Sequence, residues 1–207
     1  MKTLVIGDLH GQKNLAEKAI DTGYPVIFVG DYVDSFNKDA VACIETLKFV
    51  LESIESGKAQ GLLGNHEMSY IDDSMRCSGY NPLTHNMIRH LDISSLKSYM
   101  YAEGFLITHA GISQNLLNSN HINLDEYLLK EDYNQIGRSR GGSSLCGGLY
   151  WCDWSEFDPV EGVDQIVGHS RGKDIREKSN NFCIDVLEDS NPRGLLIEDG
   201  VAEILEL

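Results

Sequence analysis

The feature that most constrains the fold is a short apolar run followed by a turn and a side chain that can bind a metal. The clearest case is Val26-Ile27-Phe28-Val29, which runs into Gly30 and Asp31. A short apolar run of this kind predicts a buried strand. A carboxylate at the end of such a strand is costly to bury without a partner. Four other apolar runs end in the same way, and the polar residues that follow them are Asp8 and His10, Asn65 and His66, His109, and His169.

The first third of the chain alternates predicted strands and helices. Strands are expected at 3–7, 26–30 and 60–64, and helices at 14–20 and 39–56. This order describes two consecutive βαβ units, which form a parallel sheet. Parallel sheets bind ligands beyond the carboxyl ends of their strands, where these polar residues fall.

The remainder of the chain has a weaker pattern. It contains no internal repeat, low-complexity tract or linker, so we predict a single domain over residues 1–207. The expected elements are helices at 83–91 and 123–133, the second capped by Asn123, strands at 104–108, 164–168, 181–186, 194–198 and 201–206, and a turn at 191–194.

The charge of the chain restricts its partners. With 32 acidic and 17 basic residues, the formal net charge is −15. Such a surface repels phosphate backbones, so we expect no nucleic-acid partner. It also repels phosphorylated substrates unless bound cations reverse the potential locally.

The cysteines and the apolar segments indicate a compartment. The five cysteines form no C-x-x-C pair, so we expect free thiols in a reducing environment. No signal peptide and no apolar run of membrane-spanning length is present. We therefore expect a cytoplasmic protein with no membrane partner; the sequence leaves its oligomeric state open.

The polar residues at the strand ends suffice for two metal ions. Asp8 and His10 lie two apart, so in extended backbone they face the same way and could hold one ion together with Asp31. A second ion could take Asp31 from its other side, with Asn65, His109 and His169. Oxygen and nitrogen ligation without thiolate suits Mn²⁺, Fe or Zn²⁺ and does not choose between them. Two ions about 4 Å apart can generate a nucleophilic hydroxide and clamp a phosphoryl displacement.

Two further residues have predicted catalytic roles. His66 follows a predicted ligand and is free to act as a general acid. Asp34 is free of ligand duty and could orient His66. Taken singly, each motif has a structural explanation: Asp-x-His and Asn65 as turn residues, His109 or His169 as a buried histidine, Asp34 as a helix cap. Their joint occurrence favours a site, whereas His85, His90 and His121 are expected at the surface or in packing.

This combination resembles the calcineurin-like metallophosphoesterase superfamily, and particularly small bacterial and bacteriophage serine/threonine phosphatases of the phosphoprotein phosphatase branch. The resemblance implies an α/β fold of four layers, α-β-β-α, with Asp31 bridging two divalent metal ions and His66 paired with Asp34. Residues 149–153 are also similar to the Leu-Trp-Ser-Asp segment of that branch. The motifs that carry the resemblance are Gly7-Asp8-Leu9-His10-Gly11, Gly30-Asp31-Tyr32-Val33-Asp34, Gly64-Asn65-His66-Glu67, His109-Ala110-Gly111 and Gly168-His169-Ser170.

One departure from the family pattern concerns the substrate. The second motif of the family usually continues with Asp-Arg-Gly, and that arginine grips phosphate, whereas this chain has Ser35 and Phe36. Serine cannot replace the planar fork of an arginine. Arg140 or Arg138 is best placed to compensate, and Arg76 and Arg171 are weaker candidates.

The leading functional hypothesis is an Mn²⁺-type phosphatase that cleaves phosphate monoesters, on phosphoserine/phosphothreonine proteins or small molecules, by attack of a metal-bridged hydroxide. The nearest alternative is a diadenosine tetraphosphate-type pyrophosphohydrolase. A phosphodiesterase or nuclease is disfavoured, because Arg171 stands where a second histidine would be expected. The third hypothesis, from another class, is an inactive metal-binding scaffold.

Overall fold

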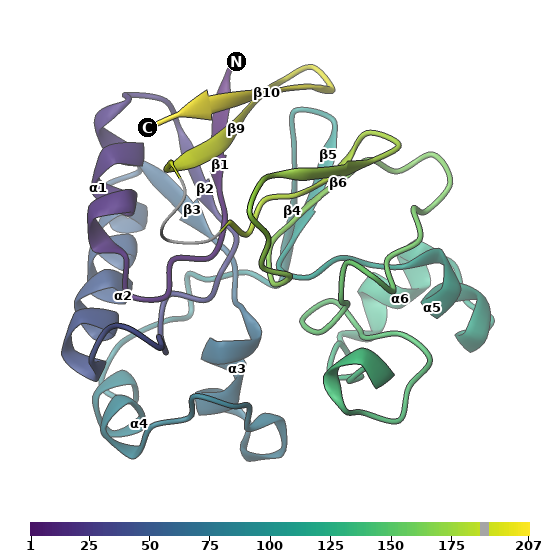
Figure 1. Ribbon diagram of the computed structural model, residues 1–207, viewed down its shortest axis with the longest axis horizontal. Helices are drawn as coiled ribbons and strands as arrows, with labels where there is room; N and C mark the ends of the chain where they lie inside the picture. Colours follow the sequence, from purple (N-terminus) through teal and green to yellow (C-terminus); the bar gives the residue numbers. More distant parts are fainter. Residues whose placement is uncertain (187–190) are drawn as a thin grey trace.

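The computed structural model describes residues 1–186 and 191–207, and within these ranges the chain forms two packed five-stranded sheets flanked by helices (Figure 1). This confirms the predicted four-layer α/β class. The first sheet has the strand order β10-β9-β1-β2-β3, with bounds β1 Thr3–Ile6, β2 Val26–Phe28, β3 Ala59–Gly61, β9 Arg193–Glu198 and β10 Val201–Glu206. The second has the order β4-β5-β6-β8-β7, with bounds β4 Tyr99–Ala102, β5 Phe105–Thr108, β6 Gln165–Val167, β7 Arg176–Lys178 and β8 Asn181–Cys183.

The first sheet separates two apolar cores. Leu4 and Ile6 of β1 pack with helices α1 (Lys13–Asp21) and α2 (Ala40–Glu55), which cover the outer face of this sheet (Figure 1). Val5, between them, packs with residues of the second sheet. This alternation follows from the period of two along a strand, and it explains why Leu4, Val5 and Ile6 of β1 are all apolar.

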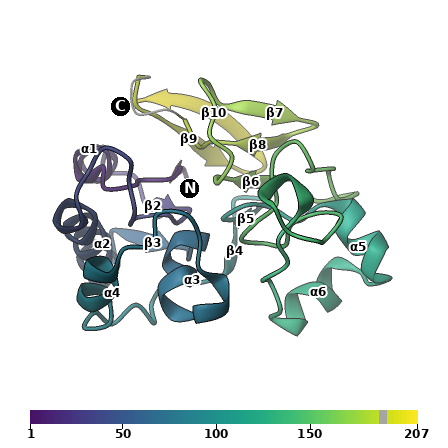
Figure 2. The same cartoon turned by 60° about the horizontal axis from the view of Figure 1, so that its bottom comes forward.

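The second sheet carries helices α5 (Gln114–Asn120) and α6 (Leu124–Lys130) on its far side, as Figure 2 shows. Their apolar residues form a third core with the segment around Trp151. Asn123 caps α6 as predicted, because its side chain accepts a hydrogen bond of 2.9 Å from the Glu126 amide.

Both sheets present parallel strands to the same region of the molecule. β1, β2 and β3 are parallel to one another, as are β5, β6 and β8. The segments that follow five of these strands, β1, β2, β3, β5 and β6, carry the predicted metal ligands and the pair of His66 and Asp34.

Several predicted boundaries were wrong. The helix expected at 123–133 ends at Lys130, because Glu131 adopts a left-handed backbone (φ 53°). The strand expected at 181–186 ends at Cys183, and the helix expected at 83–91 is α4, Pro82–Ile88. The pattern also missed α5, β4, β7 and helix α3 (Asn65–Ile71), in which site residues occupy the positions that would otherwise show an apolar stripe.

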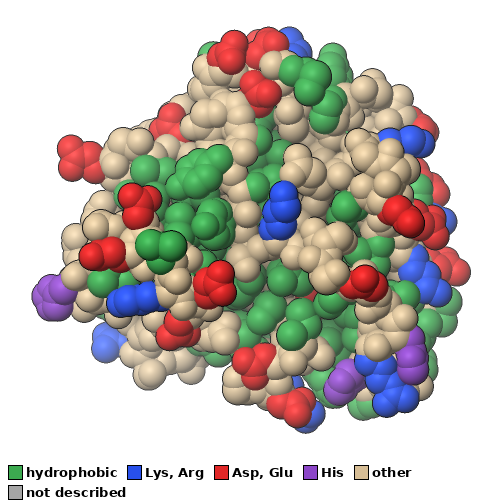
Figure 3. All heavy atoms as spheres, turned by 180° about the vertical axis from the view of Figure 1, so that it is seen from behind, with side chains coloured by type: hydrophobic (Ala, Val, Ile, Leu, Met, Phe, Trp, Pro, Cys, Tyr) green, Lys and Arg blue, Asp and Glu red, His purple; other side chains and the backbone are tan. Residues whose placement is uncertain are grey.

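The surface agrees with the acidic composition. On the face seen in Figure 3, acidic side chains are spread out rather than gathered into one patch. Among the described residues, no helix combines the length and the apolar character needed to cross a membrane.

Candidate metal centre

The predicted donors meet at the carboxyl ends of the parallel strands. Asp8 and His10 follow β1, Asp31 follows β2, and Asn65 follows β3. His109 and His169 follow β5 and β6 of the other sheet. All six side chains are buried or nearly so, and the structure brings all six together.

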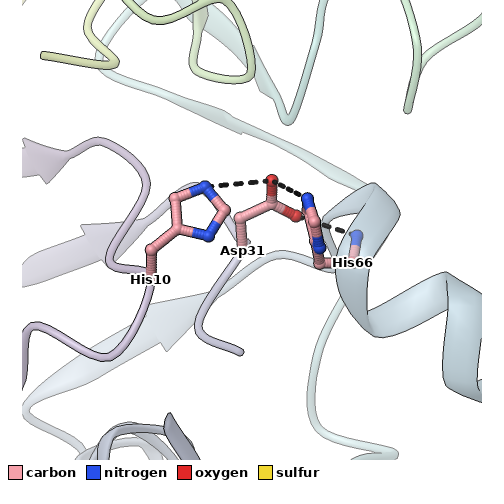
Figure 4. A group of neighbouring side chains, drawn as sticks. All are labelled: His10, Asp31 and His66. Carbon is pink, nitrogen blue, oxygen red and sulfur yellow. Dashed lines mark hydrogen bonds and ion pairs between the residues drawn. The ribbon is translucent and has the colours of Figure 1, made fainter. Parts of the chain in front are cut away.

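Asp31 lies at the centre of the cluster. Its Oδ2 atom is 3.4 Å from His109 Nε2, 3.7 Å from His10 Nε2 and 4.0 Å from His66 Nε2. Figure 4 shows His10 and His66 facing the Asp31 carboxylate from opposite sides. Asp31 therefore belongs to two donor groups at once, one with His10 and His66 and one with His109 and His169.

The hydrogen bonds of two histidines fix which ring nitrogen faces the cluster. Nδ1 of His10 lies 2.6 Å from the Asp34 carbonyl oxygen, and Nδ1 of His109 lies 2.9 Å from the Val29 carbonyl oxygen. A carbonyl only accepts, so each Nδ1 carries the proton and donates it. In the neutral ring, Nε2 is then the nitrogen that could offer a lone pair to a metal ion, which is the usual arrangement of a metal-binding histidine.

Asn65 joins the second group. Its Oδ1 atom lies 3.0 Å from His109 Nε2 and 2.8 Å from His169 Nδ1. The other ring nitrogen of His169, Nε2, is buried without a hydrogen-bond partner. A cluster of converging oxygen and nitrogen lone pairs with one orphaned nitrogen fits divalent cations.

The pKa shifts in the centre also indicate a site that would bind cations. Burial raises the pKa of Asp8 well above its usual range, and the nearby Asp185 carboxylate adds to this. Burial opposes charge on His109, but the Asp31 carboxylate outweighs it and raises the His109 pKa to about 9. Asp31 keeps a lowered pKa in spite of burial because His109 and His66 stabilise its charge. In the protein alone, the proton on His109 thus balances part of the carboxylate charge that cations would otherwise balance.

The backbone of the site is held in strained conformations. His10, Asp31, Asp34 and His169 have φ values of 41°, 52°, 58° and 63°, in the left-handed region that non-glycine residues rarely adopt. Such residues cost on the order of 1–3 kcal/mol each and persist only where the surroundings enforce them. Their concentration at these loops marks a preorganised site.

Glu67 is the residue that enforces one of these loops, a role that the sequence analysis missed. It is fully buried, and its carboxylate accepts hydrogen bonds from the amides of Asp31 (2.8 Å), Tyr32 (2.8 Å), Val33 (3.1 Å) and Gly64 (3.0 Å). Burial and the Asp31 carboxylate raise its pKa to about 7. These four hydrogen bonds hold the loop after β2 against the start of α3.

Gly64 is required at this junction for a steric reason. A Cβ atom on it would collide with the Asp31 carboxylate and the Asp31 amide nitrogen. The close approach lets the first turn of α3 reach Asp31, whose Oδ1 accepts a hydrogen bond of 3.0 Å from the His66 amide (Figure 4).

The predicted pair of His66 and Asp34 is also in contact. His66 Nδ1 lies 3.0 Å from Asp34 Oδ2, and the Tyr70 hydroxyl donates to the other carboxylate oxygen of Asp34. Burial disfavours the charged imidazole, but Asp31 and Asp34 outweigh it and raise the pKa of His66 well above its ordinary value. A proton held on His66 at neutral pH suits a general acid.

Asp185 is a further site residue that the sequence analysis missed. It follows the apolar run Phe182-Cys183-Ile184 after β8, which is the same signal as at the other strand ends. The prediction placed it inside a longer strand. Asp185 is buried near Asp8, and its only charged partner among the described residues is Arg171, with Nε 3.7 Å from Oδ1.

The centre opens into a cleft of about 680 Å³. Ser35 and Phe36 line it, and Phe36 is 91% exposed. Three arginines also line it: Arg76, Arg140 and Arg171. Arg138 is not among the lining residues.

Arg140 is held at the cleft by two contacts. It forms an ion pair of 2.8 Å with Asp153 and donates a hydrogen bond of 3.3 Å to the His169 carbonyl oxygen. Arg76, by comparison, pairs with Asp73 at 2.8 Å and stacks on Tyr80. Of these two arginines, Arg140 is the one bonded to the loop that carries His169.

Comparison with known proteins assigns the family. A sequence profile of the calcineurin-like phosphoesterases matches residues 1–170, which include all six donors. The chain belongs to this family and is a metal-dependent phosphoesterase, so the predicted family and enzyme class are confirmed. The family implies divalent metal ions, and the donor groups described above fit them. No curated protein sequence matches the chain significantly.

Solved structures share the fold. A cold-active protein tyrosine phosphatase of a psychrophilic Shewanella species superposes with a TM-score of 0.59 at 16% identity, over 99% of this chain and 80% of that one. A protein serine/threonine phosphatase of Saccharomyces cerevisiae, similar to human phosphatase PP5, gives 0.60 at 15% identity, over 100% and 80%. At these identities the likeness concerns the fold alone.

Proposed function

We propose that the chain is a dinuclear metal-dependent phosphatase that hydrolyses phosphate monoesters on phosphoproteins or small molecules. The observation that carries the proposal is the position of Asp31, whose carboxylate is shared by two donor groups, one with His10 and His66 and the other with His109 and His169. One carboxylate between two such groups is the arrangement that a bridged metal pair needs.

In this proposal Asp8, His10 and Asp31 hold one ion, and Asp31, Asn65, His109 and His169 hold the other. Bound divalent ions would supply a water of lowered pKa and neutralise the phosphoryl oxygens. Mn²⁺ is our first choice, with Fe and Zn²⁺ as alternatives; the oxygen and nitrogen donor set fits all three and does not rank them.

The chain's own residues account for the remaining steps. His66 donates the Nε2 proton to the leaving alkoxide oxygen, and Asp34 orients the ring through Nδ1. Arg140, fixed by Asp153, contacts the substrate phosphate from the rim of the cleft, in place of the arginine absent at Ser35. Arg138, the other predicted candidate, has no such support, because it does not line the cleft.

Both structural relatives are described as protein phosphatases, one for tyrosine and one for serine or threonine. This supports a phosphoprotein substrate without choosing the residue.

The test is an assay of protein stripped with EDTA and reloaded with Mn²⁺. We expect cleavage of p-nitrophenyl phosphate only after reloading. The values of kcat/KM on phosphoserine, phosphothreonine and phosphotyrosine peptides and on diadenosine tetraphosphate then define the substrate. A preference for the dinucleotide would replace the monoesterase proposal with the pyrophosphohydrolase alternative. A metal-loaded protein that cleaves none of these substrates would support the alternative of an inactive metal-binding scaffold.

A further inference from the structure

A second cluster of metal-binding side chains lies beside the centre, at the wall of the cleft. It consists of Asp34, His66 and Cys77, whose ligand atoms all lie within 4.8 Å of one another. His66 Nδ1 is 3.0 Å from Asp34 Oδ2 and 3.5 Å from Cys77 Sγ. The other nitrogen of the same imidazole, Nε2, lies 4.0 Å from Asp31 Oδ2.

We propose that Asp34, His66 and Cys77 form a Zn²⁺-binding site, separate from the dinuclear centre, that inhibits the enzyme by occupying Nδ1 of His66. Binding of zinc does not depend on the proposed function, whereas the inhibition rests on it.

The distances from His66 Nδ1 to its two neighbours are close to those of a tetrahedral zinc site. With zinc–ligand distances of about 2.0–2.3 Å, the ligand atoms of a tetrahedral site lie about 3.3–3.7 Å apart. The 3.5 Å between nitrogen and sulfur falls within this range, and the 3.0 Å between nitrogen and oxygen needs only a small opening.

Without a cation, His66 Nδ1 can form a well-directed hydrogen bond to only one of its two neighbours. Nδ1 carries at most one proton, yet both Asp34 Oδ2 and Cys77 Sγ lie next to it. One N–H cannot point well at both. A cation between the three atoms would contact all of them, and the Tyr70 hydroxyl on Asp34 Oδ1 would orient the carboxylate, as outer partners do in metal sites.

The chemistry of the donors selects the metal. A thiolate and an imidazole favour zinc over Mg²⁺ or Mn²⁺, which prefer oxygen. The donor groups around Asp31 contain no thiol. All three residues line the cleft, so water can supply the fourth ligand and the ion can exchange. Such an open site suits reversible control better than structural support.

The consequence for the reaction follows from His66. Nδ1 contacts Asp34, which in the proposed function orients the ring so that Nε2 faces the reacting group. Zinc bound between Nδ1, Asp34 and Cys77 would replace this direct contact, so the ring would lose the partner that positions Nε2 for proton donation.

The test of binding uses Co²⁺ as a spectroscopic probe on reduced, Mn²⁺-loaded protein under anaerobic conditions. We expect a thiolate-to-cobalt charge-transfer band in the near ultraviolet that added Zn²⁺ abolishes. The band should be absent in Cys77→Ser and retained in Cys146→Ser, since Cys146 is a buried cysteine away from the cluster. Cobalt in the thiol-free dinuclear centre gives no such band. A wild-type protein without the band, or a band that survives Cys77→Ser, overturns the site.

The test of inhibition compares each variant with its own zinc-free rate. The zinc concentration for half-inhibition should rise by at least about 10–100-fold in Cys77→Ser, since even outer partners of metal ligands contribute that much to affinity. Equal inhibition of wild type and Cys77→Ser would overturn the inhibitory role and place the effect of zinc at the dinuclear centre. A protein with the cobalt band but no phosphatase activity would refute the proposed function and not the zinc site.

Discussion

A buried amide side chain, Gln165 of β6, bonds to the end of the loop that carries His109. Its Oε1 accepts a hydrogen bond of 3.0 Å from the Ile112 amide, and its Nε2 donates one of 2.9 Å to the Ile112 carbonyl oxygen. Gln165 is fully buried. We therefore expect Gln165→Met, which conserves shape and length, to leave both backbone groups of Ile112 without a partner.

The expected loss of stability follows from the number of Ile112 backbone groups that lose their hydrogen-bond partner. A buried backbone group left unsatisfied costs about 1–3 kcal/mol, so two should lower the free energy of unfolding by about 2–6 kcal/mol. Little of this is a cavity effect, because methionine fills nearly the same volume. For a chain of 207 residues the loss corresponds to a fall in Tm of roughly 4–24 °C.

The measurement is urea unfolding of the metal-free protein, with Gln60→Leu as the control. Gln60 is exposed on β3, so its replacement should change stability by less than about 0.5 kcal/mol. We also expect Gln165→Met to weaken metal binding, because the loop from His109 to Ile112 loses its anchor. Ordinary surface substitutions change the free energy of unfolding by about 0.5 kcal/mol. If Gln165→Met changes it by no more than this, the idea that the Gln165 amide holds the loop is refuted.

Three other predictions concern the proposed reaction and the fold. His66→Asn should lower kcat by roughly 10²–10⁴-fold with the metal content unchanged, as expected for loss of a general acid; unchanged turnover would remove His66 from the mechanism, and exposed His90→Asn is the control. Arg140→Ala should raise KM for a monoester, whereas Arg138→Ala, outside the cleft, should not, and equal effects on KM would argue against a phosphate contact. Asn123→Ala should lower the free energy of unfolding by about 0.5–2 kcal/mol, through loss of the α6 cap, with no effect on metal content; full stability in a thermal melt would contradict the cap.

The strand-end pattern in the sequence was enough to predict six side chains that the structure brings together. Asp8, Asp31 and Asn65 follow parallel strands of one sheet, and His109 and His169 follow strands of the other. Parallel strands bring their carboxyl ends to one edge, so a polar residue after each apolar run must lie near the others. The contact between His66 and Asp34 also agrees with the prediction, and its catalytic role stays a prediction.

The supporting residues could not be found in this way. Glu67 binds four backbone amides, and three of them lie more than 30 positions away along the chain. The approach of Cys77 to His66 likewise depends on how the segment after α3 folds back. No local periodicity records such contacts.

The sequence by itself determined the fold class and which side chains would gather at the strand ends, because apolar runs and the residues that end them are local properties. Only the tertiary structure decided which histidine nitrogen faces Asp31, which arginine reaches the cleft, and that Asp185 and Cys77 lie beside the centre. These depend on hydrogen bonds and packing between loops of two different sheets, and their geometry is set only when both sheets have packed together.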